Sequence, residues 1–254
     1  MRIPCVIIGG VKTACLSRKG LSTLMLADCL EARARPRAPK LVFSVNGNSI
    51  ARAAADPAFR RAYAEADLIH ADGQPVVLAS RLLTPTPIPE RSATTDYFHD
   101  AAKTAAAHGL SFYLLGGTGQ VNAAAAAEMQ RLYPGLRIAG RRDGYFARAD
   151  EEAVCADINS SGADIVWIGL GVPLEQDFAV RNRARLKAGW LVTCGGCFNF
   201  VTGDYARAPG WMQRVGLEWL FRVLKEPRRL FWRYALTNPR ALYMILTRSR
   251  AVPA

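Results

Sequence analysis

The sequence has no long hydrophobic run. Half of its 254 residues are hydrophobic, yet no window approaches the roughly 18 consecutive apolar residues that a membrane-spanning helix needs. The early apolar run Cys5–Ile8 is followed by two glycines and is too short for the core of a signal peptide. We therefore expect a cytoplasmic chain without a spanning helix. The balance of hydrophobic and charged residues excludes wholesale disorder.

Residues that bind metals are few and scattered. The histidines are His70, His99 and His108, and the cysteines are Cys5, Cys15, Cys29, Cys155, Cys194 and Cys197. Only Cys194 and Cys197 are close in sequence, and no second pair accompanies them, so buried structural thiols are favoured over a zinc or redox centre. No Asp-x-Asp pair is present to hold Mg²⁺. The sequence predicts no metal, no cofactor and no disulfide framework.

Acidic residues are also in short supply. The chain has 33 lysines and arginines against 21 aspartates and glutamates, a formal net charge of +12. Most of this excess lies in residues 205–254, which hold many basic side chains but only Glu218 and Glu226 as acids. A basic excess confined to one end of the chain predicts a polyanionic partner for that end.

Short apolar runs alternate with segments of helical periodicity over most of the chain. The expected strands are Val6–Gly9, Leu41–Val45, Leu68–Ala71, Phe112–Leu115, Arg137–Gly140, Ile165–Gly169 and Trp190–Cys194. The expected helices are 19–33, 48–65, 73–83, 96–109, 119–133, 149–160 and 174–187. This alternation predicts a Rossmann-like, mostly parallel sheet with helices on both faces, whose ligands bind beyond the carboxyl ends of the strands. We expect an α/β domain over 1–195 and a basic helical appendage over 196–254.

Several residues that follow expected strands are candidates for chemistry. Asp72 precedes Gly73 and a helix, where a carboxylate either acts as a general base toward a hydroxyl or caps a turn. Arg91 lies in a loop, where its guanidinium either holds a phosphate or lies on the surface. The glycine turn 116–119 either presents N–H groups to a diphosphate or forms a tight βα turn. It is not a P-loop, because no Gly-Lys-Ser/Thr follows.

The C-terminal segment combines basic and aromatic residues. A helix is expected over Trp211–Leu224, a second helix begins at Pro227, and Asn238-Pro239 is expected to break it. Phe231, Trp232 and Tyr234 alternate with arginines beyond Pro227. Such a segment either lies at an anionic bilayer interface or packs as a helical subdomain with solvated charges.

An ordered set of motifs resembles the WecG/TagA/CpsF glycosyltransferases (glycosyltransferase family 26). The motifs are Ser44-Val45-Asn46, Ala66–Gly73, Glu90-Arg91, Leu114–Gly117, Tyr133-Pro134-Gly135, Arg142–Phe146, Gly169–Pro173, Arg207–Pro209, Gly216–Arg222 and Glu226–Arg229. These bacterial inverting enzymes add the second sugar to a polyprenyl-diphosphate-linked sugar. The resemblance covers about residues 40–240 and implies a Rossmann-like fold and no metal.

The resemblance implies a role for particular residues. Asp72 matches the base that deprotonates the acceptor hydroxyl. The residues expected to contact substrate are Ser44, Asn46, Arg91, Gly116, Gly117, Glu175, Gln176 and Arg207. The tail arginines expected to meet the membrane or the diphosphate are Arg214, Arg222, Arg228, Arg229 and Arg233.

Two departures from the family pattern bear on the donor sugar. Members usually have Pro-Lys-Gln-Glu where this chain has Pro173-Leu174-Glu175-Gln176, and the glycine usually found shortly after Glu-Arg is absent after Arg91. Which of Glu175 and Gln176 faces the donor therefore stays open. A glucose donor, as in the exopolysaccharide branch of the family, is as compatible with the sequence as N-acetylmannosamine or its uronate.

The expected function is the inverting transfer of a sugar from a UDP-sugar to a lipid-linked sugar at the inner face of the cell membrane. The expected partners are the donor, the acceptor and an anionic membrane surface, and assembly into a homo-oligomer stays open. One alternative is an NADP-dependent oxidoreductase that uses the glycine turn 116–119, since Arg141-Arg142 follows the next strand. The other is a nucleic-acid-binding or lipid-binding protein built on the tail. No helix-turn-helix, RRM or zinc-finger pattern supports nucleic acid as a partner.

Overall fold

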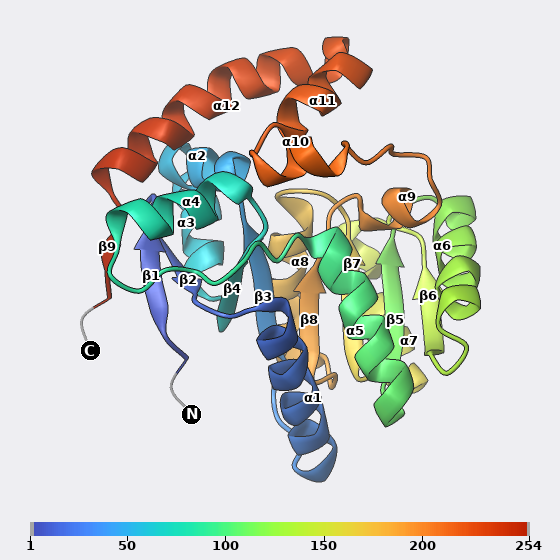
Figure 1. The fold of residues 1–254 in the computed structure, drawn as a ribbon. Coiled ribbons are helices and arrows are strands. Elements are labelled where there is room, and N and C mark those ends of the chain that lie inside the picture. Colours follow the sequence, from blue (N-terminus) through green and yellow to red (C-terminus); the bar gives the residue numbers. More distant parts are fainter. Residues whose placement is uncertain (1–2, 253–254) are drawn as a thin grey trace.

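A parallel sheet forms the centre of the molecule. The structure is a computed structural model that describes residues 3–252, with the backbone alone at Arg229. Within these residues, six parallel strands pair in the order β4-β3-β8-β7-β5-β6 (Figure 1). They are β3 (Lys40–Val45), β4 (Leu68–Ala71), β5 (Ser111–Gly116), β6 (Arg137–Arg142), β7 (Ile165–Gly169) and β8 (Trp190–Thr193). The predicted Rossmann-like α/β fold is confirmed.

Helices cover both faces of this sheet. They are α1 (Arg18–Ala34), α2 (Gly47–Ala55), α3 (Pro57–Ala64), α4 (Gln74–Leu83), α5 (Thr94–His108), α6 (Gly119–Leu132), α7 (Glu151–Ser161) and α8 (Leu174–Asn182). In β5, Phe112 and Leu114 pack on the face covered by α1, α5 and α6, whereas Tyr113 and Leu115 pack on the face of α2, α3, α7 and α8. Both faces of each central strand are thus apolar, which explains the continuous hydrophobic runs in the sequence.

The first expected strand does not join the parallel sheet. β1 (Cys5–Ile8) pairs antiparallel with β2 (Val11–Ala14) and with β9 (Arg250–Ala251) in a separate small sheet. Gly9 and Gly10, with φ of 59° and 85°, form the two-residue turn between β1 and β2. A turn this short returns the chain antiparallel, because a parallel connection needs a crossover of a dozen or more residues.

Helix boundaries also differ from those expected. The expected helix 48–65 is two helices, because Asp56 caps α3: its Oδ1 accepts hydrogen bonds from the backbone N–H of Ala58 (2.9 Å) and Phe59 (3.2 Å). Pro57 occupies the first helical position, where its missing N–H costs nothing. The expected helix 174–187 ends at Asn182 and continues as a 3₁₀ turn.

The C-terminal segment crosses the carboxyl end of the sheet. It forms α9 (Cys197–Val201), α10 (Gly210–Arg214), α11 (Glu218–Lys225) and α12 (Pro227–Thr247), which Figure 1 shows in orange and red above the strand ends. The helix expected over Trp211–Leu224 is divided at Gly216, where φ is +79°. The expected break at Pro239 is wrong, because α12 continues through it. Pro239 and Ala235, whose carbonyl loses its partner, are both exposed, so water can supply the missing bond.

Both ends of this segment are built into the rest of the fold. Cys197 and Phe198 of α9 are buried in the cluster beneath α5, and Ala241 and Ile245 of α12 are buried with α2. Over the part of the chain that the structure describes, no helix combines the length and apolarity needed to cross a bilayer.

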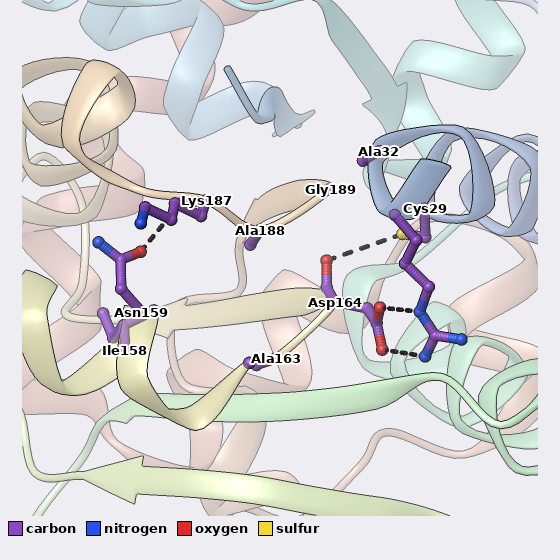
Figure 2. A pocket seen from close by; sticks show the side chains of 11 residues that line it. Cys29, Ala32, Ile158, Asn159, Ala163, Asp164, Lys187, Ala188 and Gly189 are labelled. Atoms are coloured by element: carbon purple, nitrogen blue, oxygen red, sulfur yellow. Dashed lines mark hydrogen bonds and ion pairs between the residues drawn. The ribbon is translucent and has the colours of Figure 1, made fainter. Parts of the chain in front are cut away.

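The opposite, amino end of the sheet carries a hollow of about 110 Å³ between α1 and the residues before β7 and β8 (Figure 2). Arg33 and Asp164 line it, and Arg33 Nε donates to Asp164 Oδ1 over 2.6 Å. The Asp164 carboxylate also accepts from the Ser111 N–H (2.7 Å) and hydroxyl (2.9 Å). This aspartate therefore joins α1, β5 and β7 and acts as a structural link.

Candidate active site

Asp72 and Asn46 meet because the strands before them are neighbours. β3 and β4 pair in parallel with Val45 opposite Ala71, so the next residue of each strand leaves the sheet at the same edge. Asn46 Nδ2 donates to Asp72 Oδ2 over 2.9 Å, and the Thr94 N–H donates to Asp72 Oδ1 over 2.9 Å. Asn46 is itself fixed, because its Oδ1 caps α2 by accepting from the Ser49 N–H over 3.2 Å.

The surroundings of Asp72 keep its carboxylate ionised. Burial on its own raises the pKa of Asp72, but the charge of Arg91, the hydrogen bonds from Asn46 and Thr94 and the charge of His70 outweigh it. The pKa of Asp72 is therefore lowered from its ordinary value. Asp72 as a whole residue is not fully buried. Its ionised carboxylate can accept a proton from a hydroxyl.

Arg91 lies beside Asp72, and Arg207 lies farther along, at the start of α5. Arg91 Nε donates to the backbone carbonyl of Asp72 over 2.6 Å. Arg207 donates to Thr95 Oγ1 over 2.6 Å and to Asp96 Oδ1 over 2.9 Å, at the start of α5. The structure thus gathers four residues predicted from sequence, from β3, β4, a loop and the tail, at one edge of the sheet.

Glu218 of α11 joins these arginines and was not predicted. Its Oε2 accepts from Arg91 over 2.7 Å, and its Oε1 lies 3.7 Å from Arg207 Nε. In sequence, Glu218 is one polar residue among the basic side chains of the tail, and nothing in that pattern points toward Arg91. The pairing depends on the path of the tail across the sheet.

Glu175 and Gln176 lie at the ends of the two central strands. Glu175 Oε2 accepts from the N–H of Gly171 (3.1 Å) and of Gly195 (2.9 Å), and its Oε1 accepts from Gln176 Nε2 (3.1 Å). The Glu175 carboxylate is 3% exposed, and it links the loop after β7 to the loop after β8. Burial raises the pKa of Glu175 to about 7, although these hydrogen bonds act in the opposite direction.

Comparison with known proteins identifies the family of this chain. The model of the family described as "Glycosyl transferase WecG/TagA/CpsF family" matches residues 6–253. The chain belongs to this family. It is also 32% identical over 196 residues to a curated protein of Bacillus spizizenii, covering 77% of this chain and 74% of that one. That relative is named N-acetylglucosaminyldiphosphoundecaprenol N-acetyl-beta-D-mannosaminyltransferase.

Membership in the WecG/TagA/CpsF family makes the chain a glycosyltransferase. It sets aside the oxidoreductase and the non-enzymatic binding protein as alternatives. The glycine turn of this glycosyltransferase is tightly built. A Cβ on Gly116 would lie 2.3 Å from the Gly169 carbonyl oxygen, and the Gly117 N–H donates to that oxygen over 3.3 Å. Ser44 lies in β3 opposite His70 of β4, and its backbone carbonyl accepts from the Tyr63 hydroxyl over 2.7 Å.

The tail arginines of this glycosyltransferase fall into separate groups. Arg222 and Arg207 each lie against the Phe200 ring, with guanidinium-to-centroid distances of 5.7 and 5.8 Å, beside the cluster around Asp72. Three others, Arg214, Arg228 and Arg233, are exposed. The side chain of Arg229 lies outside what the structure describes.

No metal-binding arrangement is found in residues 3–252, where no three His, Cys, Asp or Glu side chains gather closely enough to hold an ion. Cys194 and Cys197 are buried free thiols, and burial raises the pKa of both. They are inert at neutral pH, in keeping with the structural role expected for them.

The raised pKa of Glu175 predicts a dependence of stability on pH. The pKa of this carboxyl is about 7 in the folded protein, against an ordinary value of 4.5. Its protonated form therefore favours folding. Its contribution to stability is complete below about pH 4.5 and is lost as the pH rises through 7. We expect Glu175→Gln to gain roughly 1–3 kcal/mol relative to wild type on going from pH 5 to pH 8.

Urea unfolding of both proteins at the two pH values measures this difference. The glutamine keeps the contacts of Glu175, since its carbonyl can accept from both glycine N–H groups and its amide can donate to Gln176 Oε1, which has no hydrogen-bond partner in the structure. Parallel pH profiles for the two proteins would contradict the assignment.

Proposed function

We propose that this glycosyltransferase moves a sugar, with inversion, from a UDP-sugar to a polyprenyl-diphosphate-linked sugar. The observation that supports it most is the Asp72 carboxylate, held ionised by Asn46 and the Thr94 N–H beside Arg91, with Arg207 farther along. A base near two guanidiniums suits a reaction that deprotonates a hydroxyl while a diphosphate leaves. The printed name of the Bacillus relative supports the class of acceptor.

The reaction needs one proton acceptor and a stabilised leaving group. Asp72 takes the proton of the acceptor hydroxyl as its oxygen forms a bond to the anomeric carbon of the donor. The bond between that carbon and the diphosphate oxygen breaks with its electron pair, and UDP leaves from the opposite face. General-base assistance contributes typically ~10²–10⁴ in rate. Arg91 and Arg207 are placed to neutralise the charge that develops on the diphosphate.

The donor sugar is the open part of this proposal. The relative transfers N-acetylmannosamine, but this chain departs from the family pattern at Leu174–Gln176. Glu175 and Gln176 are buried and hydrogen-bonded to each other, so we propose that they shape the donor site by positioning the loops after β7 and β8. We place the reaction in exopolysaccharide or cell-surface polysaccharide synthesis.

The test is incubation with a panel of UDP-sugars and a short-chain polyprenyl-diphosphate sugar, with release of UDP as the readout. UDP release that requires both substrates supports the proposal, and no release with any donor would sink it. The panel is repeated with EDTA. Because arginines replace a metal ion in this proposal, activity should survive chelation, and a loss restored by Mg²⁺ or Mn²⁺ would show the assignment to be wrong.

We further propose that residues 196–254 dock the catalytic part, 1–195, onto the inner face of the cell membrane. Phe231 and Trp232 are 53% and 69% exposed on α12, and Arg228 and Arg233 are exposed near them. Tyr234, expected among the inserting side chains, is instead buried and packs against Trp219 with ring centroids 5.8 Å apart. The docking surface therefore consists of exposed aromatic and basic residues on the outer side of α12.

This docking predicts that Arg228→Glu weakens sedimentation with anionic liposomes. Each basic side chain near such a surface contributes about 1 kcal/mol, so the reversal should lower the partition coefficient by at least ~10-fold at low salt and by less at high salt. Lys103→Glu, which makes the same charge change on an exposed position of α5, is the matched control. Equal binding of the two variants would leave the tail as a packed helical subdomain with solvated charges.

A further inference from the structure

Glu218 occupies the place where an anionic ligand would meet the two arginines of the site. One of its oxygens accepts from Arg91 over 2.7 Å, and the other faces Arg207 over 3.7 Å. The side chains of Arg91 and Glu218 are both largely buried, with 18% and 17% exposed. The carboxylate is therefore not a solvated surface partner, and it lies close to both guanidiniums.

The carboxylates of this cluster oppose the binding of a further anion. The guanidiniums of Arg91 and Arg207 already face the carboxylates of Glu218, Asp96 and Asp72, so their charge is compensated within the protein. A diphosphate carries more than one negative charge, and like charges at close range in a partly buried site repel strongly. Binding of a diphosphate to these arginines therefore requires that a carboxylate leave, and Glu218 is the one carried by the tail.

Arg207 shows that Glu218 fills this position incompletely. Its Nε is buried and has no hydrogen-bond partner, because the nearest carboxylate oxygen, on Glu218, is beyond hydrogen-bond distance. A buried donor without an acceptor is unfavourable. A diphosphate presents more oxygens than a carboxylate, and it can satisfy this nitrogen together with Arg91.

The helix that carries Glu218 is suited to move. Every residue of α11 keeps some solvent exposure, and the helix lies between Gly216, with φ of +79°, and Pro227. It packs on α12, where Trp219 lies against Tyr234, and on α10, and Arg222 lies against the Phe200 ring. Since none of its own side chains is fully buried, a shift of α11 would expose no core residue of that helix.

We propose that Glu218 is an internal substitute for the substrate diphosphate, and that arrival of the diphosphate displaces it from Arg91 and Arg207 and releases α11. This inference rests on the proposed function, because it takes a diphosphate as the ligand of these arginines. In the empty enzyme, Glu218 then competes with anions for the two arginines. Binding of the diphosphate is thereby coupled to a rearrangement of the tail.

The test compares wild type with Glu218→Gln in binding to UDP and to inorganic pyrophosphate by calorimetry. The glutamine removes the competing charge, so we expect both anions to bind at least ~10-fold more tightly than to wild type. Glu128→Gln removes the same charge from an exposed pair with Arg131 on α6 and should change nothing. Glu218→Asp keeps the charge but shortens the side chain, so it should bind both anions with intermediate affinity. This second variant keeps the test valid if the glutamine variant misfolds.

Limited trypsin digestion reports on α11 directly. We expect cleavage after Arg222 or Lys225 to be accelerated by UDP or pyrophosphate in wild type, and to be rapid without either anion in Glu218→Gln. Equal affinities and equal digestion of the two proteins would overturn the inference while leaving the UDP-sugar donor in place. Tighter pyrophosphate binding by the variant, with no UDP binding by either protein, would support the inference and contradict the UDP donor. Failure of both anions to bind either protein would show that the arginines are not an anion site, and would also overturn it.

Discussion

Asp72→Asn should lower turnover by at least ~10² while the protein stays folded and still binds UDP. The amide cannot accept the proton of the attacking hydroxyl, whereas the carboxylate is ionised in the resting enzyme because Arg91, Asn46 and Thr94 lower its pKa. The measurement is kcat with saturating donor and acceptor. Circular dichroism and UDP calorimetry on the same preparation separate chemistry from folding.

The asparagine variant carries one structural consequence that the controls must record. Asp72 accepts hydrogen bonds on both oxygens, so an amide nitrogen at this position must face either Asn46 Nδ2 or the Thr94 N–H. Two donors in contact cost about 1–3 kcal/mol. Asp72→Ala, which has no donor, therefore accompanies it. Near-normal turnover in either variant would exclude Asp72 as the base.

Arg91→Ala should lower kcat/KM by at least ~10² and should also move the acid limb of the pH profile. The guanidinium joins the Asp72 backbone carbonyl to Glu218, and in the proposed reaction it neutralises charge on the leaving diphosphate. It is also the first favourable charge on Asp72, so its removal raises the pKa of that carboxyl and shifts the acid limb to higher pH. A purely structural role would lower activity without moving this limb.

Arg91→Lys is the informative companion. Lysine keeps the charge and therefore keeps most of the pH profile, but a single ammonium cannot reproduce the fork that bridges Asp72 and Glu218. We expect an intermediate loss of kcat/KM with little shift of the acid limb. Arg131→Ala, on the exposed face of α6, controls for loss of an arginine elsewhere. If Arg91→Ala and Arg131→Ala show the same activity, Arg91 has no part in the reaction.

The meeting of Asp72 with Asn46 was predictable because it follows from local rules. Short apolar strands that alternate with helices form a parallel sheet, and the residues that leave neighbouring strands share one edge. The hairpin of the small antiparallel sheet could also have been predicted from the sequence, since Gly9-Gly10 separates two apolar runs. The first run, Cys5–Ile8, is as short and apolar as the parallel strands, so its composition alone does not separate it from them.

Other parts of the site had no local signal. The Thr94 N–H that holds Asp72 is a backbone group, which any residue at that position would supply. Glu218 reaches Arg91 only because the tail crosses the sheet, a path decided by packing of α9 and α12 at its two ends. The burial of Glu175 depends on how the loops after β7 and β8 close around it, and this too is set by tertiary structure.

The small sheet has a consequence for shortened forms of the protein. β1 lies between β2 and β9, and its pairing with β9 joins Val6 to Ala251 and Ile7 to Arg250. A variant that ends before Arg250 would leave one side of β1 unpaired. The exposed edge of an apolar strand is a template for pairing with other chains, so such variants should aggregate. C-terminal truncations are therefore poor reagents for dissecting this enzyme, and point substitutions within α11 and α12 are the safer choice.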